Sequence, residues 1–482
     1  IASPVKHELQ SSPVHKRYSH ISQQGVLDSP GSLISGMNDE MNFGMGDDRS
    51  ISAIMNDIND ELYNLFNDTG PLISEIVAGL LSNFKTPETS TSVNLSRKEV
   101  LYPARILIII LSDMWRLGLT KQSENFLAEV LSTIQKIVSG IKGADLIPGG
   151  AFWLTNVREL YSFVVYAEKT ILHDDSYIDG IDDAEFKEYL KLIADLRDDF
   201  EALSYNVYNL WVKKLEKDLE KKIVPAVVLS QSLPGFVSSE NNNLLPKFFN
   251  SGSPTYKMDD ILTSLNNIYW SLKNYHVEAE IFTSITTTLL KFIDAVAFND
   301  IIMRKNFLSW KRGLQLHYNV TRLEEWCKGH HIAVGPDCLK HIMQVAKLLQ
   351  IKKATVEDID IVFEVCSALK PVQIQKLLTL YAIADYETPF PENISKYLAQ
   401  KVKNSGEEEN SGSKASNKPV FLPSNSGPFK DPYATLPTRE FGKIEAYIPT
   451  WLNLPITKQI VKLVTEHVQY QENGDILDQG GI

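Results

Sequence analysis

Apolar residues recur at spacings of three and four along most of this chain, and this spacing constrains the fold more than any other feature. The first such stretch comprises Ile51, Ile54, Met55, Ile58, Leu62 and Leu65. A stripe of this kind buries one side of an α-helix, whereas a half-buried strand alternates every second residue. Strand-type alternation is not sustained anywhere in the sequence. The spacing therefore predicts an all-α protein.

Similar stripes predict further helices over residues 72–84, 100–117, 126–138, 151–172 and 183–223. Gly140 is typical of a helix end, and Pro225 disfavours continuation of the long helix that precedes it. After residue 256 the period predicts helices over 258–275, 279–298, 337–349, 356–368, 373–381, 394–402 and 457–470. Since 482 residues exceed what one core usually organises, we expect two packed helical bundles.

Shifts in composition divide the chain. We expect a flexible N-terminal arm (1–47), helical subdomain I (48–231), a linker rich in Asn, Gly and Pro (232–256), helical subdomain II (257–403), a disordered loop (404–418), and a C-terminal strap and helix packing back on the bundles (419–482). The strap contains many prolines, which predict extended backbone. It also carries the aromatic residues Phe421, Phe429, Tyr433, Phe441, Tyr447 and Trp451, too many for a free linker.

Charge and cysteine content narrow the function classes. The formal net charge of -12 would repel a phosphate backbone, which argues against a nucleic-acid partner. Three cysteines in so long a chain favour reduced thiols and a cytosolic location. The longest purely apolar run, 106–111, is far shorter than the roughly 20 residues of a membrane span, so we expect no direct membrane insertion. Because the chain begins at Ile1, we expect a piece of a longer polypeptide.

One region carries a specific family signature. Residues 298–305 read FNDIIMRK, and residues 307–326 read FLSWKRGLQLHYNVTRLEEW. Further on, the sequence has LLQ at 348–350, DID at 358–360 and LKPVQIQKLLTLY at 369–381. This combination resembles the dilute domain in the globular, cargo-binding tail of fungal class V myosins. The strong resemblance covers about residues 262–386.

The resemblance implies a two-lobed, all-helical tail, similar to subunits of vesicle-tethering complexes. Such a tail would link an actin-based motor to organelle receptors (vacuole, mitochondria, peroxisome) and to Rab-type small GTPases on secretory vesicles, for polarized transport and organelle inheritance. It implies a cytoplasmic location on the actin cytoskeleton and at sites of polarized growth. It also implies dimerisation of the full heavy chain through an upstream coiled coil, and contact of the tail with its own motor domain.

The long predicted helix offers a candidate organelle-receptor surface. Asp199, Leu203, Asn206 and Asn209 lie at i, i+4, i+7 and i+10, close to one line on a helix. Leu203 also fits a core seam with Leu196, Phe200, Val207 and Leu210, so its alternative role is packing. The two asparagines belong to no apolar stripe and lower helix propensity, which makes them the better candidates.

Within the signature, Leu314 and Tyr318 follow Trp310 at four-residue spacing, and Lys347 lies on the polar face of a later helix. We take Leu314, Tyr318 and Lys347, together with Gln135, as the candidate vesicle or Rab surface. Aromatic stripes belong to the core more often than to interfaces. Partial exposure of Leu314 or Tyr318 is therefore the discriminating observation.

The remaining motifs argue for binding without catalysis. The sequence has no Walker-type phosphate loop, no H-E-x-x-H and no G-x-S-x-G, so we predict no enzymatic activity and no cofactor. Cys327, His330, His331 and Cys338 could in principle ligate zinc, but their spacing fits no common zinc pattern. Serine or threonine precedes proline at Ser3, Ser12, Ser29 and Thr86, where a proline-directed kinase could act. The alternative function is a vesicle-tethering subunit.

Overall fold

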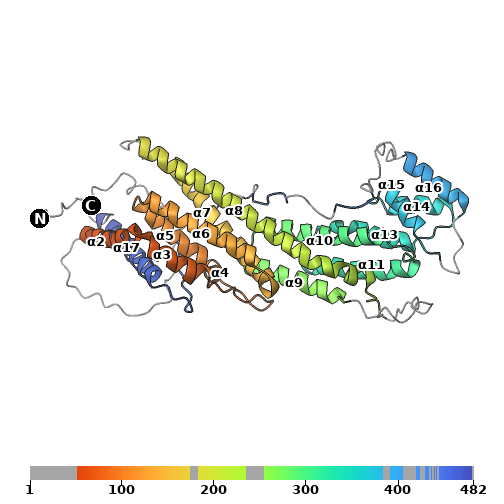
Figure 1. Ribbon diagram of the computed structural model, residues 1–482, viewed down its shortest axis with the longest axis horizontal. Helices are drawn as coiled ribbons and strands as arrows, with labels where there is room; N and C mark the ends of the chain where they lie inside the picture. The colour runs from red at the N-terminus through yellow and green to blue at the C-terminus, as the bar shows by residue number, and fades with distance from the viewer. Residues whose placement is uncertain are drawn as a thin grey trace. The chain divides into compact units, whose positions relative to one another are not determined.

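The computed structural model describes residues 51–173, 183–234, 255–383, 391–404, 420–423, 429–433, 436, 439, 441 and 444–479. The predicted all-α class is confirmed. Across these residues the ordered elements are helices (Figure 1), and an isolated parallel bridge between Leu308 and Tyr381 is the one strand-like pairing. The predicted arm (1–47) and most of the predicted linker and disordered loop lie outside the described residues.

The chain forms two compact units, and neither is a continuous stretch of sequence. Unit 1 comprises Ile1–Leu210, Ser271–Val277 and Tyr433–Ile482, and unit 2 comprises Trp211–Trp270 and Glu278–Pro432. Helix α8 (Asp183–Ile223) contributes residues to both units. The subdomain boundaries given above remain a prediction.

Unit 1 is built around large, fully buried aromatic side chains. Its other elements are α2 (Ile51–Asn67), α3 (Thr69–Ser74), the π-helix η2 (Glu75–Leu81), α4 (Arg97–Val100), α5 (Tyr102–Arg116), α6 (Thr120–Gly140), the 3-10 helix η3 (Gly143–Asp145), α7 (Leu146–His173) and α17 (Pro455–Gln479). The buried aromatics include Tyr102, Trp115, Phe126, Phe152, Trp153 and Phe200. These large apolar side chains lie on the buried faces of their helices, which is why the sequence shows strong apolar stripes there.

Helix α17 packs against α2 and α5 within unit 1, and its first turn is held by Glu75. The Glu75 carboxylate accepts hydrogen bonds from the backbone amides of Ile456 (3.0 Å) and Thr457 (2.8 Å), and from the Thr457 hydroxyl (2.7 Å). An acidic side chain at this end of a helix satisfies free amides and complements the helix dipole. At Gly79 a Cβ atom would lie 2.7 Å from Leu454 Cδ2, so glycine lets the chain leading into α17 approach η2.

A buried charged group joins the same three helices. Arg116 of α5 donates to Asp113 (2.8 Å) and to Asn59 of α2 (2.7 Å), and it lies 3.4 Å from His467 of α17. Burial raises the pKa of Asp113, although the neighbouring guanidinium acts in the opposite direction. Removing one partner would leave an uncompensated buried charge, so this group restricts how α17 can pack.

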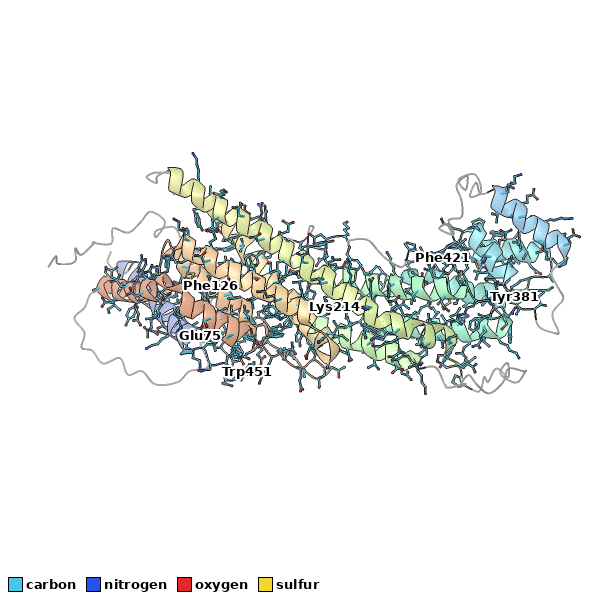
Figure 2. All side chains as sticks on the ribbon, in the orientation of Figure 1. Glu75, Phe126, Lys214, Tyr381, Phe421 and Trp451 are labelled. Atoms are coloured by element: carbon cyan, nitrogen blue, oxygen red, sulfur yellow. The ribbon has the colours of Figure 1, made fainter. Side chains whose placement is uncertain are left out.

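The C-terminal strap contains neither helix nor strand in its described residues between 420 and 454, and three of its aromatic side chains pack within unit 1. Tyr433 contacts the ring of Tyr208, Phe441 contacts Phe163 and Tyr166, and Trp451 meets Tyr102 edge-on. The prolines favour an extended backbone, and the aromatic side chains attach that backbone to unit 1 through these contacts. Glu75, Phe126 and Trp451 are marked in Figure 2.

Unit 2 contains the family signature. Its elements are the C-terminal part of α8, the π-helix η5 (Val224–Leu229), α9 (Met258–Asn274, whose last residues belong to unit 1), α10 (Ala279–Ile301), α11 (Trp310–Gly329), α12 (Gly335–Cys338), α13 (Lys340–Gln350), α14 (Val356–Val365), α15 (Pro371–Thr379) and α16 (Glu392–Asn404). By length and composition α10 could cross a membrane. However, 61% of its apolar window is buried inside the protein, as expected of a core helix.

The signature residues can be explained by packing inside unit 2. At Gly313 of α11 a Cβ atom would lie 2.6 Å from Leu349 Cβ of α13, so glycine allows these helices to pack closely. Asn319, fully buried, donates to the carbonyl oxygens of Val227 (3.0 Å) and Ser230 (3.1 Å). Gln315 donates to Asn319 (3.1 Å) and accepts from the Leu233 amide (3.3 Å). Two buried amides thus hold the segment that follows α8.

The observed helices depart from the predicted ones in a few places. Helix α8 has the predicted bounds, but the chain does not leave helical conformation at Pro225. It continues as the wider π-helix η5, and Pro225 occupies its first turn, where an amide hydrogen is not required. Helix α7 begins at Leu146, earlier than predicted. It therefore includes Gly149, which lies against Ile141 and not in a loop. Helix α17 extends to Gln479, beyond the predicted end at residue 470.

Candidate cargo-binding surfaces

The α8 face of unit 1 combines exposed polar side chains with one unsatisfied buried atom. Asp199 and Asn206 are exposed, and Asn209 is half-buried. The amide oxygen of Asn209 has no hydrogen-bond donor in the described part of the chain, although it is buried. An amide oxygen removed from water without a donor is costly, typically by about 1–3 kcal/mol. Because the atom itself has almost no accessible surface, a partner's donor can reach it only after the Asn209 side chain rotates.

Leu203 is only 6% exposed and lies among the core residues of unit 1. Its burial favours the alternative given above, in which it packs in the seam with Phe200 and Val207. Its methyl groups would then support the neighbouring surface residues from inside unit 1 rather than contact a partner directly. The polar residues Asp199, Asn206 and Asn209 are the accessible part of this face.

The α11 and α13 residues lie in unit 2, where these two helices pack against each other. Leu314 and Tyr318 are half-buried, so each is partly exposed, and Lys347 is exposed. The Ser309 side chain caps α11 by accepting from the Arg312 amide (3.3 Å). Trp310 follows directly and is 38% exposed. Gln135, assigned to the same surface, is half-buried on α6 of unit 1.

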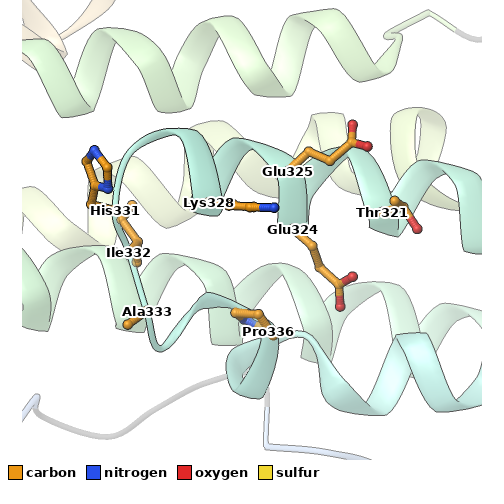
Figure 3. A pocket seen from close by; sticks show the side chains of 8 residues that line it. All are labelled: Thr321, Glu324, Glu325, Lys328, His331, Ile332, Ala333 and Pro336. Atoms are coloured by element: carbon orange, nitrogen blue, oxygen red, sulfur yellow. The ribbon is translucent and has the colours of Figure 1, made fainter.

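A surface pocket of about 560 Å³ lies at the C-terminal half of α11. Figure 3 shows its lining side chains: Thr321, Glu324, Glu325, Lys328, His331, Ile332, Ala333 and Pro336. Its wall is a turn in which His331 has a φ of 58°, a left-handed conformation that helical periodicity does not predict. Sequence reasoning missed this pocket, since Glu324 and Lys328 read as an ordinary solvated helix face.

Of the candidate zinc ligands, Cys327, Cys338 and His330 pack against neighbouring residues, whereas His331 is exposed. Cys327 and Cys338 are buried, and burial raises the pKa of Cys327 to about 12, so its thiol stays protonated. The His330 ring stacks on Trp326 with ring centroids 4.6 Å apart. Within the described residues, no group of three His, Cys, Asp or Glu side chains could hold a metal ion.

The predicted phosphorylation sites fall in two classes. Thr86 is half-buried in a loop of unit 1, where its hydroxyl hydrogen-bonds to the buried Tyr275. A phosphate there would have to displace this contact. Ser3, Ser12 and Ser29 lie outside the described residues.

Comparison with known proteins gives a consistent assignment. Residues 284–385 match the DIL domain family. Myosin-2 of Lachancea kluyveri is 62% identical over 434 residues, which is 90% of this chain and 28% of that myosin. The chain therefore spans about a quarter of the length of this relative.

Solved structures extend the match to the whole fold. A structure of a myosin V cargo binding domain is 54% identical, with a TM-score of 0.76, and the match covers 86% of this chain and 99% of that one. The structure of Myo2-GTD in complex with Smy1 is 53% identical, with a TM-score of 0.77 and the same coverage. These matches favour a motor tail over a tethering subunit, and a region separate from the motor ATPase. The chain belongs to the family of myosin V cargo-binding globular tails.

Proposed function

We propose that this tail attaches cargo to an actin-based motor through two separate surfaces, one on α8 and one on α11 and α13. Organelle receptors would bind the α8 face, and Rab-type GTPases would bind Leu314, Tyr318 and Lys347, with Gln135 as a further contact. One similar structure holds Myo2-GTD in complex with Smy1, and this complex supports protein binding as the activity of the fold. The motor itself would lie outside this chain.

The observation that carries the α8 proposal is the buried, unsatisfied amide oxygen of Asn209. Buried polar atoms without a partner are uncommon in folded proteins and call for an explanation. Asn206 lies one helical turn before Asn209 and presents an exposed amide on the same face. Together they could recognise the backbone of an extended peptide, with Asp199 available to a basic side chain.

The α11 and α13 surface has a different chemistry. Tyr318 and Leu314 on α11 offer partly exposed apolar contact, and the neighbouring helix α13 carries the exposed cation Lys347, whereas the α8 face has two amides and a carboxylate. Half-buried aromatic residues are enriched at the centres of protein interfaces, and a nearby exposed cation speeds the encounter with an acidic partner. This difference in chemistry between the two surfaces supports two classes of partner.

Affinity capture from cytosol, followed by mass spectrometry, tests the α8 surface. The Asn206→Asp variant places a negative charge next to Asp199 and Asn209, and we expect it to lose organelle receptors while retaining GTPases. Lys121→Gln, which also lowers the net charge by one, at an exposed residue of α6 in the same unit, is the matched control. Equal capture by the variant and the control would refute this location.

Direct binding of GTP-loaded Rab-type GTPases tests the second surface. Tyr318→Glu should abolish binding, because it buries a charge against an apolar contact, and Tyr318→Phe should retain most of it. Circular dichroism of each variant establishes that it is folded. If Tyr318→Glu binds these GTPases normally, the surface lies elsewhere.

The tail would act in the cytoplasm, on actin and at sites of polarized growth, as part of a heavy chain that dimerises through an upstream coiled coil. Phosphorylation at Ser3, Ser12, Ser29 or Thr86 would adjust cargo attachment, and contact between the tail and its own motor domain would inhibit the motor.

A further inference from the structure

The pocket on α11 contains a carboxylate that has no partner within the described part of the protein. Glu324 is half-buried, and the loss of water raises its pKa. It forms no hydrogen bond or ion pair in the described part of the chain, although Lys347 attracts it from a distance. A partly desolvated carboxylate of this kind gains more from a cationic hydrogen-bond donor than a fully exposed one does.

The side chains around Glu324 are arranged for a ligand that is apolar along its length and charged at its end. Figure 3 shows Glu324 pointing to the same side of α11 as Pro336, whereas Glu325 points to the opposite side. Ile332, Ala333 and Pro336 supply apolar surface, and the Thr321 hydroxyl can accept a further hydrogen bond. Lys328 lines the pocket but forms no ion pair with Glu324 or Glu325 in the described structure.

An arginine side chain has these properties. Its three methylene groups can lie along apolar surface, and its planar guanidinium is weakly hydrated and donates two parallel hydrogen bonds to a carboxylate. A lysine ammonium is more strongly hydrated and binds a carboxylate as a point charge.

The pocket continues the proposed GTPase surface along α11. Leu314, Tyr318 and Thr321 lie at i, i+4 and i+7 on one face of the helix, and Glu324 follows Thr321 by three residues, at the edge of that face. Tyr318 and Glu324 are six residues apart, or roughly 9 Å along the helix axis. One bound protein can therefore contact both positions.

We propose that this pocket is a binding site for an arginine side chain of the partner protein, with Glu324 as the carboxylate that pairs with its guanidinium. The proposal rests on the proposed function only in assigning the arginine to the partner that binds at Leu314 and Tyr318. The pocket itself can be tested without that partner.

Methyl NMR on the full chain tests the pocket directly, with N-acetyl-arginine methylamide as the probe. The Ile332 and Ala333 methyl groups line the pocket and report its occupancy. The matched ligand is N-acetyl-citrulline methylamide, which has the same shape but a neutral urea group. We expect the arginine compound to bind at least about fivefold more tightly than citrulline, since a charge-assisted hydrogen bond is the difference.

Two variants complete the test. Glu324→Gln keeps the size of the side chain and should abolish the preference for arginine over citrulline, whereas Glu364→Gln, at an exposed residue of α14 outside the pocket, should retain it. Thr321→Arg places a guanidinium one turn before Glu324 and should prevent binding of the probe, so it serves if Glu324→Gln fails to fold. Equal methyl shifts with both compounds, or an unchanged arginine preference in Glu324→Gln, would overturn the proposal.

The same variants separate this inference from the proposed function. If GTPase binding depends on Tyr318 but the arginine preference does not depend on Glu324, the pocket assignment is wrong and the surface stands. If the arginine preference depends on Glu324 but Tyr318→Glu binds GTPases normally, the pocket stands and the surface assignment is wrong.

Discussion

Gly313 and Gly329 lie on the same helix, α11, in different surroundings. A Cβ atom at Gly313 would meet Leu349 Cβ at 2.6 Å and the Ala346 carbonyl oxygen at 3.1 Å, whereas a Cβ atom at Gly329 would meet nothing within 4 Å. Contacts below 3 Å force atoms to move, and overpacking of this kind costs about 1–3 kcal/mol. The signature glycine is therefore explained by helix packing.

We expect Gly313→Ala to lower the free energy of unfolding by about 1–3 kcal/mol, and Gly329→Ala to leave it unchanged or raise it slightly. Urea denaturation followed by circular dichroism measures both values. Similar midpoints for the two variants would show that α13 moves away from Gly313 at little cost.

A half-buried glutamate makes stability depend on pH. Burial, with a contribution from Glu220, raises the pKa of Glu216 to about 7, against the effect of Lys213. Because its pKa is higher in the folded protein than in the unfolded chain, the folded state binds the proton more tightly. The contribution of Glu216 to stability is therefore fully present below about pH 4.5 and is lost as the pH rises through 7.

Glu216→Gln removes this titration. We expect the variant to be more stable than the wild type at pH 8, by on the order of 1 kcal/mol after allowing for partial exposure, and about equally stable at pH 5. Urea midpoints at the two pH values test this, since the difference between the two proteins isolates the titration of Glu216 and of its charged neighbours Lys213 and Glu220. An equal difference at pH 5 and pH 8 would contradict the assignment.

At the scale of elements, local sequence signals predicted the helices well. The bounds of α8 were predicted correctly, because its long stripe has no interruption before Pro225, and the start of α10 was also correct. The receptor-binding role of the asparagines on α8 remains a prediction, based on their position outside every apolar stripe. The role of Glu75 could not be predicted, because the amides that it accepts from, those of Ile456 and Thr457, lie about 380 positions later in the sequence.

The pocket around Glu324 was equally inaccessible to sequence reasoning. It depends on the turn after α11, where His331 adopts a positive φ and where Gly335 approaches Cys327. At Gly335 a Cβ atom would lie 2.5 Å from Cys327 Sγ. Histidine and glycine are both common in loops, so the sequence gives no signal of the pocket. Only the folded chain brings Ile332 and Pro336 to the same pocket as the Glu324 carboxylate.

We expect the cap at Glu75 to control the order of α17. Glu75→Gln can accept fewer hydrogen bonds and loses the favourable interaction with the helix dipole, which together cost about 1–2 kcal/mol. Hydrogen exchange of the first α17 amides should become faster, while exchange in α11 should not change. Glu124→Gln, at an exposed position on α6, is the control. Unchanged exchange at Ile456 and Thr457 would show that α17 is held by its apolar face alone.

At the scale of the whole molecule, each compact unit takes residues from both sides of the predicted linker. Unit 1 includes Ser271–Val277 and Tyr433–Ile482, and unit 2 includes the C-terminal end of α8 and η5. Asn274 donates to the Ser90 carbonyl oxygen (2.9 Å), and Asn319 donates to Val227 (3.0 Å). A chain divided at the linker therefore loses buried contacts in both units.

We expect the fragments 1–231 and 257–482 to be unfolded or aggregated when each is expressed alone, and to form a folded complex when they are co-expressed. Size-exclusion chromatography and circular dichroism of the single and paired fragments test this. Two separately folded, monomeric fragments would show that the predicted subdomains are autonomous.

The packing of α17 against α2 has a consequence for synthesis of the protein. Residues 51–67 emerge from the ribosome early, but their partner at residues 455–479 emerges almost 400 positions later. At typical translation speeds of about 5–20 residues per second, this stretch of α2 waits on the order of half a minute for its partner. During that time its apolar face must be shielded by nascent neighbours or chaperones, and a prematurely terminated message would yield a tail in which α2 lacks the helix it packs against.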